Sequence, residues 1–399
     1  MEPDTQLRRF DFAGLILGVS CALGVISTVI ILVLMPVNRH FAVSRDFIVY
    51  WASGQQLTHH GNPFDPQRMS RTEHAGGFDR SGSFYMRNPP WSLPLTLPLG
   101  FVGAQAAALP WSLLLIGLLV LSVRILWKIF GRSGTHLEWL GYCFPPALQC
   151  VLMGQTSLFL LLGLVLFLRW GRSRPFLAGS ALWLCTLKPH LFVPFGLLLV
   201  VWIVVGRRWR ILLGTVTAFA ASCLAIEAVD PAVWSQYLHW AGASGISHEA
   251  SPSFGVALRN LVNPAAEWLV FVPCVLGAVW ALAYFWPRRH VWDWMEHGQL
   301  VILVSLLVAP YCWVLDQSIA LPALLCAAVR SRSRTVLATL AAICLVLELQ
   351  PLLFSAGLNS FWYLWPAPAW IAWYLWARRS ARQPIPSASP LATPAAVAE

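Results

Sequence analysis

The stretch FAGLILGVSCALGVISTVIILVLM, residues 12–35, decides the fold class of this chain. It contains no charged residue and exceeds the roughly 20 apolar residues that a helix needs to cross a bilayer core about 30 Å thick. It is too long for the core of a signal peptide, and no small-residue cleavage site separates it from the next polar stretch. We therefore predict a retained first transmembrane helix whose N-terminus, with Arg8 and Arg9, lies in the cytoplasm.

The rest of the chain has the same character. Of its 399 residues, 58% are hydrophobic and 11% are charged, whereas soluble domains have about 45–50% apolar and about 25% charged residues. This composition excludes a soluble globular protein and predicts an all-α polytopic membrane protein. About 12 spans would use roughly 240 residues and leave too few for a separate catalytic domain. Any chemistry must therefore take place in loops and helix ends at the membrane surface.

Eleven further apolar runs are predicted as transmembrane helices. They cover about 108–129, 137–153, 156–170, 175–187, 190–206, 211–229, 265–286, 298–313, 317–329, 335–356 and 362–377. With the first helix they make a bundle of about 12 helices, within a range of about 10–13, and 91–107 is predicted as a half-inserted or interfacial helix. We predict one membrane domain over 1–380, with outer loops at 36–90 and 230–263, and a disordered cytoplasmic tail over 381–399.

The basic residues sort to one side of this topology. With the N-terminus inside, 19 of the 27 Arg and Lys residues fall on cytoplasmic ends and loops, and eight fall outside. Such a bias orients helices in membranes, so the net charge of +10 is a topology signal, with anionic lipid headgroups as the partner. Nucleic acid is not an expected partner. The outer basic residues are Arg39, Arg45, Arg68, Arg71, Arg80, Arg87, Lys188 and Arg259.

No cofactor is expected from the sequence. It shows no nucleotide-binding fold, no P-loop and no cluster with metal-ligand spacing, although a divalent ion held by Asp46 and a second carboxylate stays open. The nine cysteines lie mostly inside apolar runs, where they act as small hydrophobic residues. Cys150 and Cys312 fall near predicted outer helix ends, and whether they pair is left open.

Charged residues are rare in the middle of the predicted helices and crowd the outer interface. A transporter usually carries ionisable residues near the bilayer midplane and paired broken helices. The distribution therefore favours an enzyme that acts on the polar head of a membrane-anchored substrate. A transporter or flippase of lipid-linked or small polar solutes is the alternative, and a non-catalytic scaffold in an envelope-synthesis complex is a third interpretation.

The segment 44–57 predicts a short amphipathic helix just beyond the first span. Phe47, Tyr50, Trp51 and Gly54 recur at helical spacing on one side, and the aromatic rings suit the headgroup zone. Asp46 stands near the N-terminus of this helix. The helix macrodipole, or pairing with Arg45, is a sufficient reason for a carboxylate there, so this position alone does not make Asp46 catalytic.

Several short segments of the chain occur in the same order as in a known family of proteins. They are DFIVYWASG (46–54), HGNPFDP (60–66), RNPP (87–90) leading to Pro98-Leu99, Gly154-Gln155, Ala178-Gly179, Leu187-Lys188-Pro189, and Ala309-Pro310 with Trp313. In order and spacing, from residue 46 to about residue 320, the chain resembles glycosyltransferase family 87.

Members of that family are C-type membrane glycosyltransferases that use polyprenyl-phosphate sugars, and mannose transfer is their characterised activity. The resemblance implies a C-type bundle that transfers a hexose, mannose, to a hydroxyl of a glycan or glycolipid acceptor, and we expect the transfer to invert the anomeric carbon. It also implies a bacterial plasma membrane, with the active site on the outer face and both termini in the cytoplasm.

Sugar transfer from a lipid phosphate needs a base for the acceptor proton and a cation for the departing phosphate. In C-type enzymes the base is an aspartate in the first outer loop, and Asp46 matches that position. Lys188 matches the family's Lys-Pro motif, and a lone ammonium at the outer side is costly unless it binds something; snorkelling to the surface is the alternative. Arg87 and Arg259 are further candidates for the donor phosphate, which arginine binds bidentately.

Other residues are candidates for acceptor or sugar contacts, namely Asp316, Trp51, Tyr50, Asn88 and Gln155. Val314-Leu315 stand where the family carries polar or histidine residues, so a helix cap or an ion pair is the stronger interpretation of Asp316. Asp65 is expected to bond backbone amides of its own turn. In the second outer loop, acceptor contacts are expected from Tyr237, His239, His248 and Glu249. Most of the 22 tryptophans are predicted to be interfacial anchors.

Overall fold

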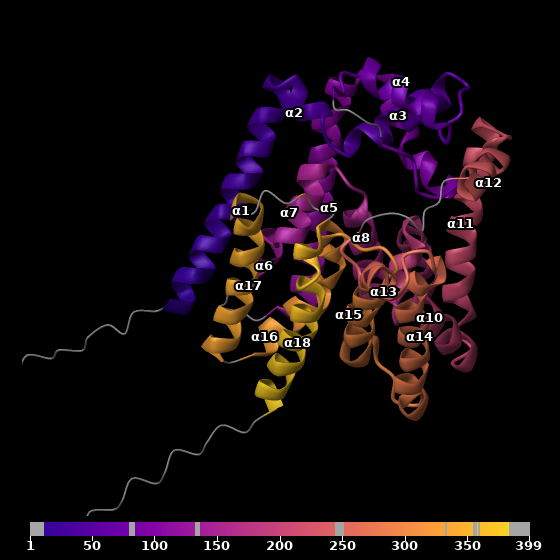
Figure 1. The fold of residues 1–399 in the computed structure, drawn as a ribbon. Coiled ribbons are helices and arrows are strands. Elements are labelled where there is room, and N and C mark those ends of the chain that lie inside the picture. The colour runs from indigo at the N-terminus through magenta and orange to yellow at the C-terminus, as the bar shows by residue number, and fades with distance from the viewer. Residues whose placement is uncertain are drawn as a thin grey trace, which may run out of the picture.

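The computed structural model describes residues 12–79, 84–131, 136–243, 251–331, 333–353, 357 and 360–382. These residues fold into helices, and none of them forms a strand (Figure 1). Five helical segments are long and apolar enough to cross a membrane: Gly14–Val37, Ala104–Phe130, Trp209–Val229, Glu267–Arg288 and Arg334–Pro351. The chain is therefore an all-helical integral membrane protein, as its composition predicts.

The predicted number of about 12 transmembrane helices is not confirmed. The described residues contain five candidate spans, or six if the bent pair Pro175–Leu187 and Pro189–Val205 counts as one. Proline explains much of the difference, because it removes a helical hydrogen bond. The run at 137–153 divides before Pro145 into two short helices, α6 (Glu138–Tyr142) and α7 (Pro145–Met153).

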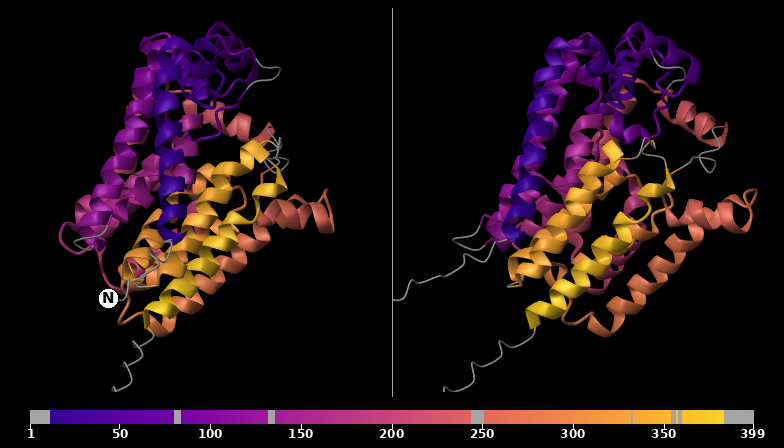
Figure 2. Two further views of the ribbon diagram at one scale, coloured as in Figure 1. Left: turned by 90° about the vertical axis from the view of Figure 1, so that its left-hand side faces the viewer. Right: turned by 60° about the vertical axis from the view of Figure 1, so that its left-hand side comes forward.

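The five candidate spans form the frame of the bundle. They lie in α1 (Phe12–Val37), α5 (Ala104–Phe130), α11 (Trp209–Val229), α17 (Arg334–Leu353) and the segment Glu267–Arg288, whose central helix is α14 (Val272–Phe285). The helix α1 packs against α5 and α17, and α17 packs against α18 (Figure 2). Shorter helices fill the space between them: α8 (Ser157–Trp170), α9 (Pro175–Leu182), η3 (Trp183–Leu187), η4 (Pro189–Phe192), α10 (Val193–Val205), α13 (Phe254–Val262), η6 (Glu267–Phe271), η7 (Trp286–Arg288), η8 (Trp294–Gly298), α15 (Gln299–Val308), η9 (Val314–Ala320), α16 (Leu321–Arg330), η10 (Phe361–Tyr363) and α18 (Pro366–Arg382).

One end of the molecule is built from the first loop, and we call it the first-loop end. The helices α2 (Arg39–Val43), α3 (Phe47–Thr58) and α4 (Pro66–Ala75) gather there, and α12 (Val233–Ala243) lies beside them (Figure 1). The segment 91–107 was expected to be one interfacial helix. It instead forms two 3-10 helices, η1 (Pro90–Leu95) and η2 (Leu97–Phe101), before α5 begins, because Pro94 and Pro98 interrupt α-helical hydrogen bonding.

The prediction that α3 is an amphipathic helix is wrong. Nine of its 12 residues are buried, Tyr50 and Trp51 among them. Gly54 shows why, because a Cβ at this position would lie 2.3 Å from the carbonyl oxygen of Thr96. The helix α3 thus runs in backbone contact with the η1–η2 segment. The first loop is a packed cap, with α3 at its centre.

The opposite end of the molecule brings predicted cytoplasmic loops together. Arg172, after α8, forms an ion pair of 2.9 Å with Asp293. Glu296 pairs with Arg330 at the end of α16, at 2.6 Å, and with Arg378 in α18. The connection from α14 to α15, which carries both acidic residues, lies at the end away from α3 and α4 (Figure 1). Loops predicted on one side of the membrane therefore contact one another. The predicted tail lies outside the described residues from 383 onward, and α18 continues to Arg382.

Candidate active site

Asp46 occupies the N-cap position of α3, but its side chain does not cap the helix. Arg45 is occupied elsewhere, since its guanidinium donates to the carbonyls of Leu152 and Val151 at 2.7 and 3.4 Å and so caps the end of α7. Asp46 therefore stands at the N-terminus of α3, where the macrodipole favours a carboxylate, but it neither caps the helix nor hydrogen-bonds Arg45. Instead, Nε2 of Gln155 donates a hydrogen bond of 2.8 Å to Oδ2 of Asp46.

Gln155 joins Asp46 to a buried cation. Its Oε1 accepts hydrogen bonds from Tyr50 Oη at 2.7 Å and from Lys188 Nζ at 3.1 Å. An ammonium only donates hydrogen bonds, so the amide oxygen must face Lys188 and the amide nitrogen must face Asp46. The orientation of the Gln155 amide is thus set by Asp46 on one side and by Lys188 on the other.

The turn that carries Gln155 depends on a glycine. Gly154 ends α7 with φ of 75°, in the left-handed region that favours glycine. A Cβ at Gly154 would lie 2.6 Å from Cβ of Phe47, the first residue of α3. The indole N–H of Trp111 donates to the Gly154 carbonyl at 2.8 Å. The α7–α8 corner and the start of α3 are therefore in direct contact, which brings Gln155 to Asp46.

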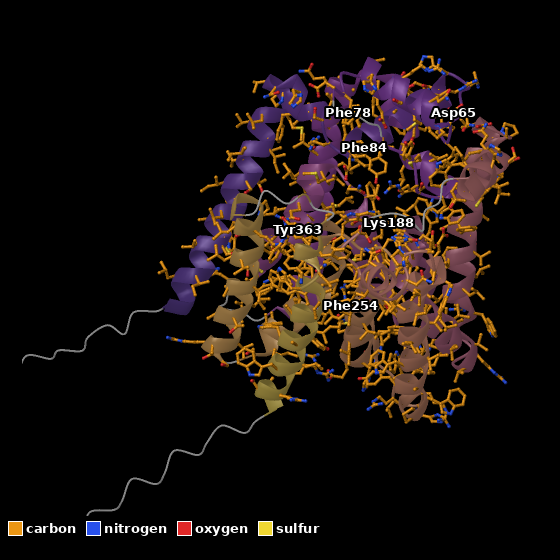
Figure 3. All side chains as sticks on the ribbon, in the orientation of Figure 1. Asp65, Phe78, Phe84, Lys188, Phe254 and Tyr363 are labelled. Atoms are coloured by element: carbon orange, nitrogen blue, oxygen red, sulfur yellow. The ribbon has the colours of Figure 1, made fainter. Side chains whose placement is uncertain are left out.

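Lys188 lies where the chain bends by 120° between the helical segments on either side of it. Only 8% of this residue is exposed, and it lies below the first loop, whereas Asp65 lies at the outer edge (Figure 3). Its ammonium donates to Asp316 Oδ1 at 2.7 Å, to Gln155 at 3.1 Å and to Ser157 Oγ at 3.2 Å. The alternative of snorkelling is wrong, because Lys188 is buried and all three of its hydrogens have partners.

Asp316 is fully buried and combines the two roles that its sequence position suggested. Oδ1 accepts from Lys188 and from Ser157 Oγ, the latter at 2.6 Å, while Oδ2 accepts the backbone N–H of Trp313 at 3.1 Å. It therefore caps η9 and forms an ion pair, with a lysine rather than with an arginine. Removing one partner of such a buried pair typically costs about 3–5 kcal/mol.

The electrostatic surroundings make Asp46 a stronger base than an ordinary aspartate. Burial raises the pKa of Asp46, and the negative charge of Asp316 acts in the same direction. The hydrogen bond from Gln155 and the positive charges of Lys188 and Arg87 oppose this rise without cancelling it. A general base works best when its pKa approaches the working pH. The arrangement is therefore suited to accepting a proton.

The sequence model of glycosyltransferase family 87 matches residues 85–310, more than half of the chain. The chain belongs to glycosyltransferase family 87. It is therefore a membrane glycosyltransferase, which acts on a sugar donor and an acceptor. No curated protein and no solved structure matches it. Within this family 87 member, the matched region includes Gln155 and Lys188, whereas Asp46 and Asp316 lie outside it.

The other predicted site residues of this family 87 member divide into two groups. We call the hydrogen-bonded residues Asp46, Gln155, Lys188, Ser157 and Asp316 the cluster. Asn88 adjoins it, because its Nδ2 donates to the carbonyl of Leu187, next to Lys188, at 3.3 Å. Arg87 is exposed, and its charge reaches Asp46. By contrast, no hydrogen bond or ion pair among the described residues links Arg259 or Trp51 to the cluster. The Trp51 indole donates to the Val102 carbonyl at 2.8 Å.

Arg259 nevertheless has an unusual environment. It lies on α13, only 6% of it is exposed, and within the described part of the chain its Nη1 has no hydrogen-bond partner. In the second outer loop, the Tyr237 ring packs 5.1 Å from the ring of Phe64 and so attaches α12 to the first loop. His239 is exposed on α12, and His248 and Glu249 lie outside the described residues.

Sequence reasoning missed Ser157, which bonds both Lys188 and Asp316. The signal was present, since Ser157 follows Gly154-Gln155 at the start of an apolar run. Cys150 and Cys312 are both free and buried, so they do not pair. Across the described ranges, no group of three or more His, Cys, Asp or Glu side chains is arranged to hold a metal ion.

Proposed function

We propose that this glycosyltransferase transfers a hexose, mannose, from a polyprenyl-phosphate sugar to a hydroxyl of a glycan or glycolipid acceptor, with inversion and with Asp46 as the base. The observation that supports this proposal is the hydrogen-bonded line from Asp46 through Gln155 to Lys188 and Asp316. It is built beneath the first loop, at the end of the molecule away from the predicted cytoplasmic loops. We assign that end to the outer face of the bacterial plasma membrane.

The proposed reaction is a direct displacement. The acceptor O–H gives its proton to Asp46 while its oxygen forms a bond to the anomeric carbon of the donor. The bond from that carbon to the phosphate oxygen breaks, and the polyprenyl phosphate leaves with the electron pair. Oδ2 of Asp46 is held by Gln155, so Oδ1 is the oxygen that we assign to the proton.

Arginine residues are better placed than Lys188 to hold the leaving phosphate. The hydrogens of Lys188 are already donated, and Asp316 neutralises its charge. A phosphate would have to displace one of these partners to bond Lys188 directly. Arg259 has a buried Nη1 without a described partner, and Arg87 is exposed near Asp46. We therefore assign the phosphate to these two guanidinium groups, with Lys188 supporting Gln155.

The donor class is tested with purified enzyme in proteoliposomes. Polyprenyl-phosphate mannose, polyprenyl-phosphate glucose and nucleotide-activated mannose, each radiolabelled, are supplied with a mannose-containing glycolipid acceptor. We expect transfer from polyprenyl-phosphate mannose, with a product of opposite anomeric configuration to the donor by NMR. Transfer only from the nucleotide sugar, or a product that retains the donor configuration, would contradict the proposal.

A further inference from the structure

His190 lies two residues beyond Lys188, in η4, and neither the family match nor the proposed reaction gives it a role. Its Nε2 is buried and forms no hydrogen bond with any described residue, although the residue as a whole is partly exposed. Buried polar atoms in folded proteins almost always have a partner, and one that lacks a partner destabilises the protein unless a ligand or water supplies it.

The surroundings of His190 place it against the active site. Lys188 and Asp316 are both close enough for their charges to act on the imidazole. The ring also meets Tyr311 edge-on, with centroids 6.2 Å apart. Tyr311 packs with Val256 of α13, the helix that also carries Arg259. His190 is therefore near the Lys188–Asp316 pair and contacts a tyrosine that packs against the helix whose guanidinium we assign to the donor phosphate.

The chemistry of the unpartnered nitrogen narrows the class of ligand. In a neutral imidazole, Nε2 is a donor in one tautomer and an acceptor in the other. A phosphate oxygen only accepts and fits only one of them. A sugar hydroxyl both donates and accepts, so it satisfies either tautomer. The transferred sugar is attached to the donor phosphate, so its hydroxyl groups lie within a few ångströms of any group that binds the phosphate.

We propose that Nε2 of His190 hydrogen-bonds a hydroxyl of the transferred sugar and so contributes to donor specificity. This inference rests on the proposed function, because it requires that the donor sugar bind near both the cluster and Arg259. A site that is built to bond a hydroxyl rejects the analogue that lacks it, since a buried polar group is then left unpaired.

The test compares donors that each lack one hydroxyl. Wild-type enzyme and His190→Phe are assayed in proteoliposomes with polyprenyl-phosphate mannose and with its 2-, 3-, 4- and 6-deoxy analogues. Phenylalanine keeps the edge-on contact with Tyr311 but has no ring nitrogen. His59→Phe, at an exposed histidine of the first loop, is the matched control. His190→Asn retains a donor and an acceptor and is tested alongside.

We expect the wild type to discriminate against one deoxy donor by on the order of 10- to 100-fold in kcat/KM. His190→Phe should lose that discrimination at the same position and keep it at the others, while His59→Phe matches the wild type. A uniform loss with every donor, or an unchanged pattern, would overturn the inference. His190→Asn should keep at least part of the discrimination, because its amide can still bond a hydroxyl. If His190→Phe does not fold, the same comparison with His190→Leu, which also has no polar side-chain atom, decides. Failure of the wild type with every polyprenyl-phosphate donor would instead refute the proposed function.

Discussion

Gln155 is the residue that connects the candidate base to the buried ion pair. It donates to Asp46 and accepts from Tyr50 and Lys188. It therefore links the proposed base to the ion pair between Lys188 and Asp316. An amide can do this because its two ends have opposite hydrogen-bonding character. Neither a carboxylate nor a hydrocarbon side chain of the same length offers both.

Replacing Gln155 should therefore change the pH dependence of transfer. Asp46 works as a base only when it is ionised, so the rate rises as the pH passes upward through the pKa of Asp46. The hydrogen bond from Gln155 lowers that pKa. Gln155→Met removes the bond, and we expect the acidic limb of the kcat/KM profile to move to higher pH.

The control is Gln67→Met, at an exposed glutamine of α4. Its acidic limb should coincide with that of the wild type. An acidic limb that stays in place in Gln155→Met would mean that Asp46 does not titrate in the rate-determining step.

Individual site residues could be predicted from the sequence, but their connections could not. Asp46, Lys188 and Gln155 all lie in the cluster, and the family's short motifs made each of them a candidate. The pairing of Lys188 with Asp316, by contrast, joins positions 128 residues apart. A single sequence carries no record of such a contact. For the same reason Ser157 and the corner-capping role of Arg45 went unrecognised.

At the scale of elements, the site is formed where α3 meets the corner between α7 and α8. Gly154 allows this contact, since its positive φ and the 2.6 Å clash of an added Cβ with Phe47 leave no room for a side chain. We expect Gly154→Ala to lower the free energy of unfolding by about 1–2 kcal/mol or more through the left-handed backbone alone. It should also lower transfer activity, because α3 carries Asp46 at its start.

Gly117→Ala is the matched control, because Gly117 lies inside α5 and an added Cβ there meets nothing within 4 Å. Alanine favours a helix over glycine, so this variant should be at least as stable as the wild type and equally active. Denaturant unfolding in detergent, with activity measured on the same preparations, compares the two. Equal behaviour of both variants would show that the corner does not depend on Gly154.

Long uninterrupted elements could be predicted from the sequence, and interrupted ones could not. The run predicted at 211–229 is α11 (Trp209–Val229), and that at 108–129 lies inside α5 (Ala104–Phe130). The predicted runs 175–187 and 190–206 left a break at Lys188 but did not indicate its 120° bend, and the run 137–153 passed through the break before Pro145. The burial of α3 was missed because it arises from backbone contact with a segment that follows about 40 residues later, which hydropathy does not register.

At the scale of the whole molecule, charge is sorted between two ends. Basic and acidic residues of the predicted inner loops form ion pairs at one end, as Arg172 and Glu296 do. The cluster around Asp46 lies beneath the first loop, toward the other end of the molecule. The 11% of residues that are charged are thus divided between ion pairs at one end and the candidate site toward the other.

The orientation of the two ends is open to a direct test. In spheroplasts, a membrane-impermeant maleimide should label Gln67→Cys on α4 and should not label Arg379→Cys on α18; both positions are exposed. The native cysteines are buried or partly buried, so background labelling should be low. Labelling of both after permeabilisation is the control. Labelling of position 379 alone in intact spheroplasts would reverse the assigned orientation.

The central claim is that Asp46 takes the acceptor proton. The measurement that tests it most directly is the transfer rate of Asp46→Asn in proteoliposomes, at saturating polyprenyl-phosphate mannose, relative to wild type. Asp65→Asn is the matched control. Asp65 caps α4 through bonds of 2.9 and 3.0 Å to the backbone N–H groups of Gln67 and Arg68, and asparagine caps equally well. The one other described contact of its carboxylate is a partly exposed ion pair of 3.6 Å with Arg68, and such pairs contribute little to stability. The account predicts a loss of about 10²- to 10⁴-fold for Asp46→Asn and wild-type transfer for Asp65→Asn. Transfer by Asp46→Asn at the wild-type rate would contradict it.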